Sequence, residues 1–250
     1  MPPPADDSKI RVILLDIEGT TTPIDFVYKT LCPYASSKVE FFLREHGRDP
    51  EIQLLTAELH AQNRRDESAG LAPPAWIAET EGAHLTSSVG YVHWLIARDS
   101  KSTALKTLQG KIWQQGYERG ELHGEVYADV PPAFARWRRQ SREICIYSSG
   151  SVLAQQLLFR STVTGDLTKY ISHFFDTRIG VKTESGSYTK IAESLARQAG
   201  EVLFVSDAII EIEAARAASM PAALCVRDSK VALHASAEKI ITTFDQIFPD

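Results

Sequence analysis

The sequence IRVILLD spans residues 10–16 and is apolar almost without a break. Only Arg11 interrupts it, β-branched side chains are frequent in it, and it ends in Asp16. Such a run predicts a β-strand that is buried on both faces, as in a parallel sheet. An acidic side chain then lies where the strand ends.

Three more apolar runs follow along the chain, and each ends in polar residues. They are residues 144–147 before Ser148 and Ser149, residues 202–205 before Asp207, and residues 222–226 before Arg227. Helical patterns separate them at residues 133–140, 188–199 and 208–220, the second with Ser187 as its expected N-cap. Alternating strands and helices predict right-handed βαβ crossovers and therefore an α/β fold with a doubly wound parallel sheet.

The interval from residue 27 to residue 125 breaks this alternation. It contains no convincing strand, but it has helical patterns at residues 39–44, 52–64, 89–98 and 103–117. An interval of this length is far too long for a βα loop. We therefore expect residues 1–26 and 126–250 to form the α/β core, and residues 27–125 to form an inserted all-helical cap after the first strand.

The composition is that of an ordinary globular protein, because 44% of the 250 residues are hydrophobic and 24% are charged. Lys and Arg number 27 against 32 Asp and Glu, which gives a net charge of -5 and no basic run. Nucleic acid is therefore not an expected partner. No window approaches the ~18 apolar residues of a membrane span, so we expect no membrane partner either.

The polar, Pro-rich residues 1–9 lack the apolar stretch of a secretory signal. Cys32, Cys145 and Cys225 show no CxxC spacing, and two of them lie within apolar runs, which is typical of buried thiols in a reducing compartment. Both observations favour a cytoplasmic location. The seven histidines show no HxH or HxxxH pairing, so a zinc site is not expected.

In an open α/β sheet the ligand lies beyond the carboxyl ends of the strands. Asp16 and Asp207 both occupy such positions. Two carboxylates about 4 Å apart repel by roughly 4 kcal/mol at an effective dielectric of about 20, and a divalent cation between them reverses that repulsion. The two acids therefore predict a Mg2+ site.

The remaining polar residues at the strand ends favour a phosphoryl group. Ser148 supplies a hydroxyl donor, Lys182 a positive charge, and Gly19 permits backbone N–H groups to turn toward an anion. Attack by the Asp16 carboxylate on phosphorus would give an aspartyl-phosphate. Glu18 could then protonate the leaving oxygen and afterwards deprotonate the hydrolytic water.

Each of these residues also has a simpler interpretation. An Asp after an apolar run is often a turn residue or a helix N-cap, and a loop lysine is usually solvated. We prefer Lys182 to Lys190 because Lys190 falls inside a predicted helix, facing away from the strand ends. For Glu211, four residues after Asp207, helix capping or solvation is the preferred role over holding a metal-bound water.

The segment DIEGT at residues 16–20 resembles the first motif, DxDxT, of the haloacid dehalogenase-like phosphohydrolases. Ser148, Lys182 and Asp207 fall where the later motifs of that superfamily lie. The resemblance is closer to one family, enolase-phosphatase or acireductone synthase, which has Glu at the second acidic position. It extends over residues 12–220, chiefly in residues 12–23, 103–110, 147–151, 175–182 and 187–192.

The resemblance implies a Mg2+-dependent bifunctional enzyme of methionine salvage, expected as a monomer. Its substrate would be 2,3-diketo-5-methylthiopentyl-1-phosphate, which the enzyme enolises and dephosphorylates to the acireductone 1,2-dihydroxy-3-keto-5-methylthiopentene. Carried over by position, the metal ligands are Asp16, Glu18 and Asp207, the phosphate-binding residues are Ser148, Ser149 and Lys182, and the catalytic residues are Asp16, Glu18 and Lys182. After Val226 this sequence departs from the Arg-Pro-Gly that the family tends to have.

Other functions remain open from the residues alone. Another haloacid dehalogenase-like small-molecule phosphatase, a haloacid dehalogenase and a phosphoglucomutase relative would share the acidic nucleophile. A signalling receiver module also places an acceptor Asp, metal ligands, a hydroxyl and a Lys at the ends of its strands. The long helical insertion argues against the receiver module. The sequence does not indicate which residue would act as the base in enolisation.

Overall fold

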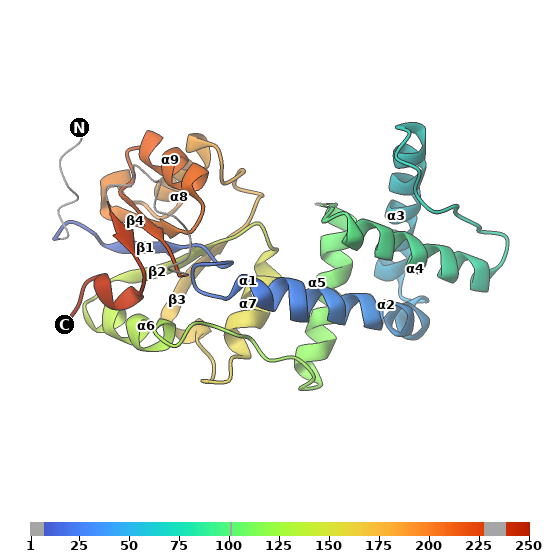
Figure 1. The fold of residues 1–250 in the computed structure, drawn as a ribbon, viewed down its shortest axis with the longest axis horizontal. Helices are drawn as coiled ribbons and strands as arrows, with labels where there is room; N and C mark the ends of the chain where they lie inside the picture. Colours follow the sequence, from blue (N-terminus) through green and yellow to red (C-terminus); the bar gives the residue numbers. More distant parts are fainter. Residues whose placement is uncertain (1–7, 101, 228–238) are drawn as a thin grey trace. The chain divides into compact units, whose positions relative to one another are not determined.

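The computed structural model describes residues 8–100, 102–227 and 239–250. The chain divides into two compact units, drawn in Figure 1. One contains residues 1–26 and 123–250, and the other contains residues 27–122. The predicted insertion ended at residue 125, three residues beyond the end of the second unit.

The first unit contains a six-stranded sheet in the order β3-β2-β1-β4-β5-β6, and every pair of neighbouring strands is parallel. The strands are β1 (Val12–Leu15), β2 (Glu143–Tyr147), β3 (Ile171–Phe175), β4 (Val202–Ser206), β5 (Ala222–Cys225) and β6 (Ile240–Ile241). This arrangement confirms the predicted α/β fold with a parallel sheet. The first predicted strand, β1, lies at its centre and is buried along its whole length.

Helices cover both faces of this sheet: α8 and α9 lie on one side, and α6 and α7 on the other (Figure 1). The α-helices of the first unit's described residues are α1 (Ile24–Phe26), α6 (Val130–Arg139), α7 (Val152–Arg160), α8 (Ser185–Ser194) and α9 (Ile209–Ala217). Short 3-10 turns occur at Thr168–Tyr170, Ala199–Glu201 and Phe244–Gln246. Successive side chains of β1 point to opposite faces of the sheet. Val12 and Leu14 pack into the hydrophobic core on the face that α8 and α9 cover.

The prediction for α8 was wrong at both ends. The helix begins at Ser185 rather than at residue 188, with Glu184 as its N-cap, and it ends at Ser194. Ala196 has a φ of 51°, a left-handed conformation that cannot continue a helix. Ser187 is inside the helix, and its Oγ donates to the Val181 carbonyl at 2.7 Å instead of capping.

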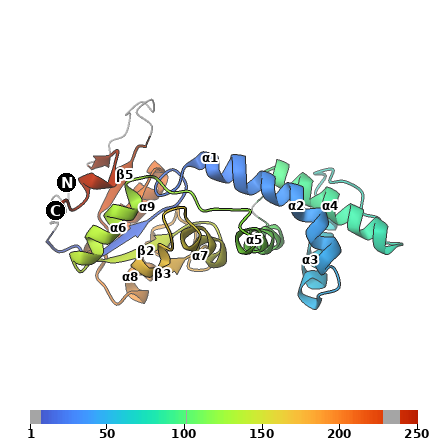
Figure 2. The same ribbon diagram turned by 90° about the horizontal axis from the view of Figure 1, so that it is seen from below.

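Among the described residues of the second unit, all regular secondary structure is helical. After a π-helical turn at Val27–Leu31 come α2 (Cys32–His46), α3 (Pro50–Ser68), α4 (Glu81–Ala97) and α5 (Thr103–Glu118). In Figure 2 α5 is seen nearly end-on, while α2 and α4 run across the view. Buried apolar side chains from all four of these helices form the core of the unit.

Cys145 in β2 and Cys225 in β5 are buried free thiols, and burial raises the pKa of each to about 12. Within residues 8–100, 102–227 and 239–250, none of the helices is long and apolar enough to cross a bilayer.

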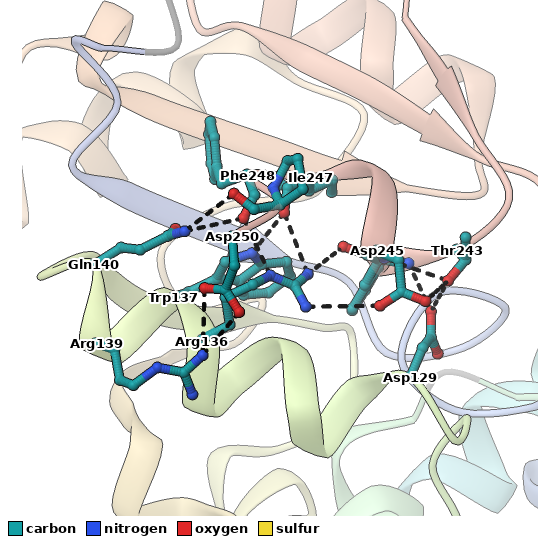
Figure 3. A network of polar contacts seen from close by, with 12 residues as sticks. Asp129, Arg136, Trp137, Arg139, Gln140, Thr243, Asp245, Ile247, Phe248 and Asp250 are labelled. Atoms are coloured by element: carbon teal, nitrogen blue, oxygen red, sulfur yellow. Dashed lines mark hydrogen bonds and ion pairs between the residues drawn. The ribbon is translucent and has the colours of Figure 1, made fainter.

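The C-terminal segment is tied to α6 by side chains that donate to its carbonyl groups (Figure 3). The buried Arg136 guanidinium donates to the carbonyls of Phe244 at 2.7 Å and Phe248 at 3.1 Å. The neighbouring Trp137 indole donates to the Ile247 carbonyl at 2.9 Å. These bonds satisfy the backbone of a segment that has little regular secondary structure of its own.

Replacing Arg136 by Met should lower the free energy of unfolding by about 2–4 kcal/mol, because buried carbonyls would lose their charged donor. Arg139→Met is the matched control, since Arg139 pairs with Asp250 at the exposed surface and such pairs contribute little. Urea unfolding followed by circular dichroism measures both. Equal effects in the two variants would contradict the importance of the buried guanidinium.

Candidate active site

The carboxyl ends of β1, β2 and β4 lie side by side, because these strands pair in parallel register. Leu15 of β1 is opposite Ile146 of β2 and Val205 of β4. Asp16 and Ser148 follow their strands immediately, and Asp207 follows the last residue of β4. The topology therefore brings together side chains that are up to 191 positions apart in the sequence.

Asp16 lies at the centre of this group and is only 3% exposed. Its Oδ1 forms an ion pair with Lys182 Nζ, and its Oδ2 lies 3.4 Å from Ser206 Oγ. Lys182, in the loop before α8, is also buried, whereas Lys190 is exposed on α8. Burial alone would lower the pKa of Lys182, but the charges of Asp16 and Glu211 raise it above its usual range.

Glu211 is neither a helix cap nor a solvated surface residue, so the preferred role in the sequence analysis was wrong. Its Oε2 lies 2.6 Å from Lys182 Nζ and accepts a hydrogen bond from Ser206 Oγ at 2.8 Å. Glu211 lies four residues after Asp207, and this spacing is the signal that the sequence offers. The spacing shows that the two acids can share a face, but it does not show that a distant lysine meets one of them.

Glu18 and Ser148 face each other across the ends of β1 and β2, with Ser148 Oγ 3.4 Å from Glu18 Oε2. Ser148 is buried, whereas Ser149, the next residue, is exposed. Burial, and then the charge of Asp16, raise the pKa of the Glu18 carboxyl above its usual value. This environment therefore favours the protonated form of Glu18.

Asp207 approaches the backbone of the first loop closely at Gly19. Gly19 has a φ of 72°, and a Cβ built there would lie 2.0 Å from Asp207 Oδ2. Only glycine fits, because any side chain would collide with this carboxylate. Burial, followed by the charge of Asp16, raises the pKa of Asp207 to about 7.

The expectation that Gly19 turns backbone N–H groups toward an anion was wrong for the N–H groups of residues 19–22. The Gly19 N–H donates to the Thr22 carbonyl at 2.8 Å, and those of the next three residues all donate to the Ile17 carbonyl. These four donors are used to close the loop itself. An anion must therefore rely on other donors.

A second part of the site, missed by the sequence analysis, holds this loop from the other side. Arg227 donates twice to the Thr20 carbonyl, at 2.7 Å and 2.9 Å, and once to Asp129 Oδ2 at 2.5 Å. The Tyr127 N–H donates to the next carbonyl, that of Thr21, at 3.0 Å. Residue 227 ended a predicted strand, but nothing in the sequence indicated its partners.

The side chains that could bind a metal at this site are mostly acidic, and they fit a Mg2+ ion. Among the described residues, Asp16, Glu18, Asp207 and Glu211 gather around a single cation, Lys182, and burial followed by the charge of Asp16 raises the pKa of Asp207. In the described part of the chain, no three His, Cys, Asp or Glu side chains lie close enough together to hold a metal ion by themselves. Mg2+ does not need one, since it commonly binds one or two carboxylates together with water and substrate phosphate.

The raised pKa of Asp207 predicts how the metal-free protein responds to pH. Between its ordinary value of 3.8 and about 7, the native carboxyl holds a proton that the unfolded chain has lost. The free energy of unfolding should therefore fall as the pH rises through this window, by on the order of 1–2 kcal/mol after allowance for solvent screening.

Urea titrations from pH 4 to 8 in EDTA measure this dependence. Asp207→Asn is the matched variant and should reduce it, because the amide does not titrate, while Glu18 and Glu211, whose pKa values are also raised, keep the remainder. Mg2+ should restore stability to the wild type near pH 8, since a ligand that binds only the native state stabilises it. A wild type whose stability rises steadily from pH 4 to 8 in EDTA would contradict the prediction.

The model of the haloacid dehalogenase-like hydrolase family matches residues 10–219. Enolase-phosphatase E1 of Synechococcus elongatus is 46% identical to this chain over 238 residues, which cover 95% of this chain and 98% of the relative. Enolase-phosphatase E1 of Xenopus tropicalis is 41% identical over 256 residues and covers 100% and 97% of the two chains. The chain belongs to the enolase-phosphatase family of haloacid dehalogenase-like hydrolases.

A solved structure agrees with this family assignment. The Unknown transcript 4 protein of Saccharomyces cerevisiae superimposes with a TM-score of 0.75 and is 31% identical, covering 95% of this chain and 99% of that one. As a member of the enolase-phosphatase family, the present chain is an enzyme of the phosphatase class. Of the alternatives left open by the residues, the receiver module is excluded.

Proposed function

We propose that this protein dephosphorylates 2,3-diketo-5-methylthiopentyl-1-phosphate to the acireductone 1,2-dihydroxy-3-keto-5-methylthiopentene, through an aspartyl-phosphate at Asp16. The observation that carries the proposal is the position of the Asp16 carboxylate. It is buried at the end of the central strand, paired with Lys182 and close to further acids. The substrate itself is proposed from the resemblance to the enolase-phosphatase family.

Binding of the phosphate would use Ser148, Ser149 and Lys182. The lysine is held as a cation by Asp16 and Glu211, so it offers a fixed positive charge at the end of the sheet. Ser148 Oγ accepts from the Gly150 N–H at 3.1 Å, which fixes its place and leaves its proton to donate. A phosphate bound here would replace part of the contact between Lys182 and Asp16.

Phosphoryl transfer would begin with attack of Asp16 on phosphorus and departure of the substrate oxygen. Glu18 is suited to give that oxygen a proton, because its raised pKa favours the protonated carboxyl. Once deprotonated, Glu18 can take a proton from the water that attacks the phosphorus and releases phosphate from Asp16. The two half-reactions return both carboxyls to their starting states.

A Mg2+ ion held by Asp16 and Asp207 would supply neutralisation of the phosphate's negative charge, and Glu18 would join its shell when deprotonated. We assign no residue to enolisation of the diketone, which rests on the relatives' names alone. We further propose that the protein works as a monomer in the cytoplasm, where a small phosphorylated metabolite of methionine salvage would reach it.

The direct test is to supply the diketone phosphate with Mg2+ and to follow the enediol absorbance and phosphate release in the same sample. Both signals should appear with the wild type, and EDTA should abolish phosphate release. Release of phosphate without the enediol signal would leave a small-molecule phosphatase of this superfamily that is not an enolase. Turnover of general phosphate esters but not of the diketone would overturn the proposed substrate.

A further inference from the structure

Three side-chain hydroxyls hold the loop that presents Lys182, each by one carbonyl. Tyr147 of β2 donates to the Gly180 carbonyl at 2.9 Å. Ser187 of α8 donates to the Val181 carbonyl at 2.7 Å, and Tyr188 of α8 donates to that of Lys182 itself, also at 2.7 Å. Three consecutive carbonyls are thus satisfied from two different elements, an arrangement we call the hydroxyl clamp.

The backbone of the loop is shaped to admit this clamp. Gly180 has a φ of 147°, and a Cβ built on it would lie 2.1 Å from Ser187 Oγ. A side chain at position 180 would therefore displace the serine hydroxyl from the Val181 carbonyl. The glycine allows the loop and α8 to approach closely enough for the hydrogen bond to form.

The two tyrosines of the clamp are rigid because their rings are packed in the core. Tyr147 and Tyr188 meet edge to face with centroids 5.7 Å apart, and Tyr188 meets Phe204 of β4 at 5.0 Å. Both tyrosines are fully buried. Lys182 Nζ lies 5.8 Å from the centre of the Tyr147 ring, so Tyr147 lies beside the lysine side chain and also holds the lysine's loop at Gly180.

We propose that Tyr147, Ser187 and Tyr188 are positioning residues for phosphate binding, acting by fixing the backbone of Lys182. The inference rests on the proposed function, in which the Lys182 ammonium binds the substrate phosphate. Asp16 at the end of β1 and Glu211 on α9 both form ion pairs with that ammonium. The clamp keeps the main chain of the lysine in place, so that its Nζ stays between the two acids and within reach of a phosphate.

The test uses orthovanadate inhibition of phosphate release as a measure of affinity for the phosphoryl group. Tyr188→Phe removes only the hydroxyl and should weaken vanadate inhibition by about 3- to 10-fold, the range expected for one hydrogen bond. Tyr147→Phe, which frees a different carbonyl, should act in the same direction. Tyr91→Phe is the control, because its buried hydroxyl donates to Asp66 in the helical unit.

A double variant separates positioning from a general loss of structure. Vanadate binding to Lys182→Met and to Lys182→Met with Tyr188→Phe is compared by equilibrium dialysis. The added Tyr188→Phe change should then have no effect, because the group it positions is absent. An equal further loss in the double variant would show a merely structural role and overturn the inference.

The remaining outcomes separate the phosphate-binding role of Lys182 from the positioning role of the hydroxyl clamp. Full vanadate affinity in Lys182→Met would overturn the phosphate-binding role of the lysine and, with it, the inference. A large loss in Lys182→Met, with both tyrosine variants equal to the wild type, would overturn the clamp alone. Because the two tyrosine variants act on different carbonyls, failure of one of them to fold leaves the other as the test.

Discussion

Asp16→Asn is expected to reduce phosphate release by on the order of 10⁴-fold or more, because an amide oxygen is a poor nucleophile and cannot form the acyl phosphate. The variant should still fold, since Asn has almost the same shape and its amide oxygen can accept from Ser206 or Lys182. The measurement is phosphate release under saturating Mg2+, beside an unfolding curve.

Asp25→Asn is the control for this substitution, because Asp25 is an exposed acid nine residues further along the same connection. It should retain activity within a factor of two or so, as a surface change usually does. Removal of the Asp16 charge should also lower the pKa values of Asp207 and Glu18, which that charge raises. Retained turnover in Asp16→Asn would show that another group is the nucleophile.

Lys182→Met is expected to affect both activity and stability. Loss of the ammonium leaves Asp16 and Glu211 buried without their cation, and breaking a buried pair in this way costs about 3–5 kcal/mol. Phosphate release should fall by on the order of 10²-fold or more, because a charged donor to the phosphate is removed. Thermal unfolding and phosphate release report the two effects separately.

Lys190→Met makes the same chemical change eight residues away on the exposed side of α8. It should alter neither property appreciably. Lys182→Arg should not rescue the site, since a planar guanidinium does not replace a compact ammonium between two carboxylates. A Lys182→Met protein as stable and active as the wild type would contradict both the ion pair and its proposed use.

The central strands of the fold could be predicted because both of their faces are buried. In β1, β2, β4 and β5 this burial requires continuous apolar runs, which are visible in the sequence. Strand β3 was missed because it lies at the edge of the sheet, where Ser172 and His173 are exposed and break the apolar run. Strand β6 was missed because two residues carry no pattern.

The helices of the second unit were placed correctly but predicted too short. Residues 39–44 were expected to be helical, whereas α2 extends over Cys32–His46. Between Cys32 and Lys38 only Ala35 is fully buried, so the first turns of α2 carry no apolar pattern of their own. The prediction for residues 52–64 was shorter than α3 (Pro50–Ser68) for the same reason.

Residues that end predicted strands were the easiest site residues to find, and Asp16, Ser148 and Asp207 do lie together at the sheet's carboxyl edge. Their partners were harder to find, because a hydrogen bond across the fold leaves no local pattern. Neither the ion pair of Glu211 with Lys182 nor the hydrogen bond from Tyr188 to the Lys182 carbonyl follows from the spacing of these residues in the sequence. Their individual chemical roles stay predictions.

The proposed chemistry depends most directly on a covalent bond between Asp16 and phosphate. The decisive measurement is rapid acid quenching of the enzyme during turnover with Mg2+, reduction with borohydride and peptide mass spectrometry. An acyl phosphate is reduced to the alcohol, so residue 16 should be recovered as homoserine in a fraction of the chains, and not when substrate is omitted. Homoserine at no position, or at another acid with residue 16 still aspartate, would contradict the account.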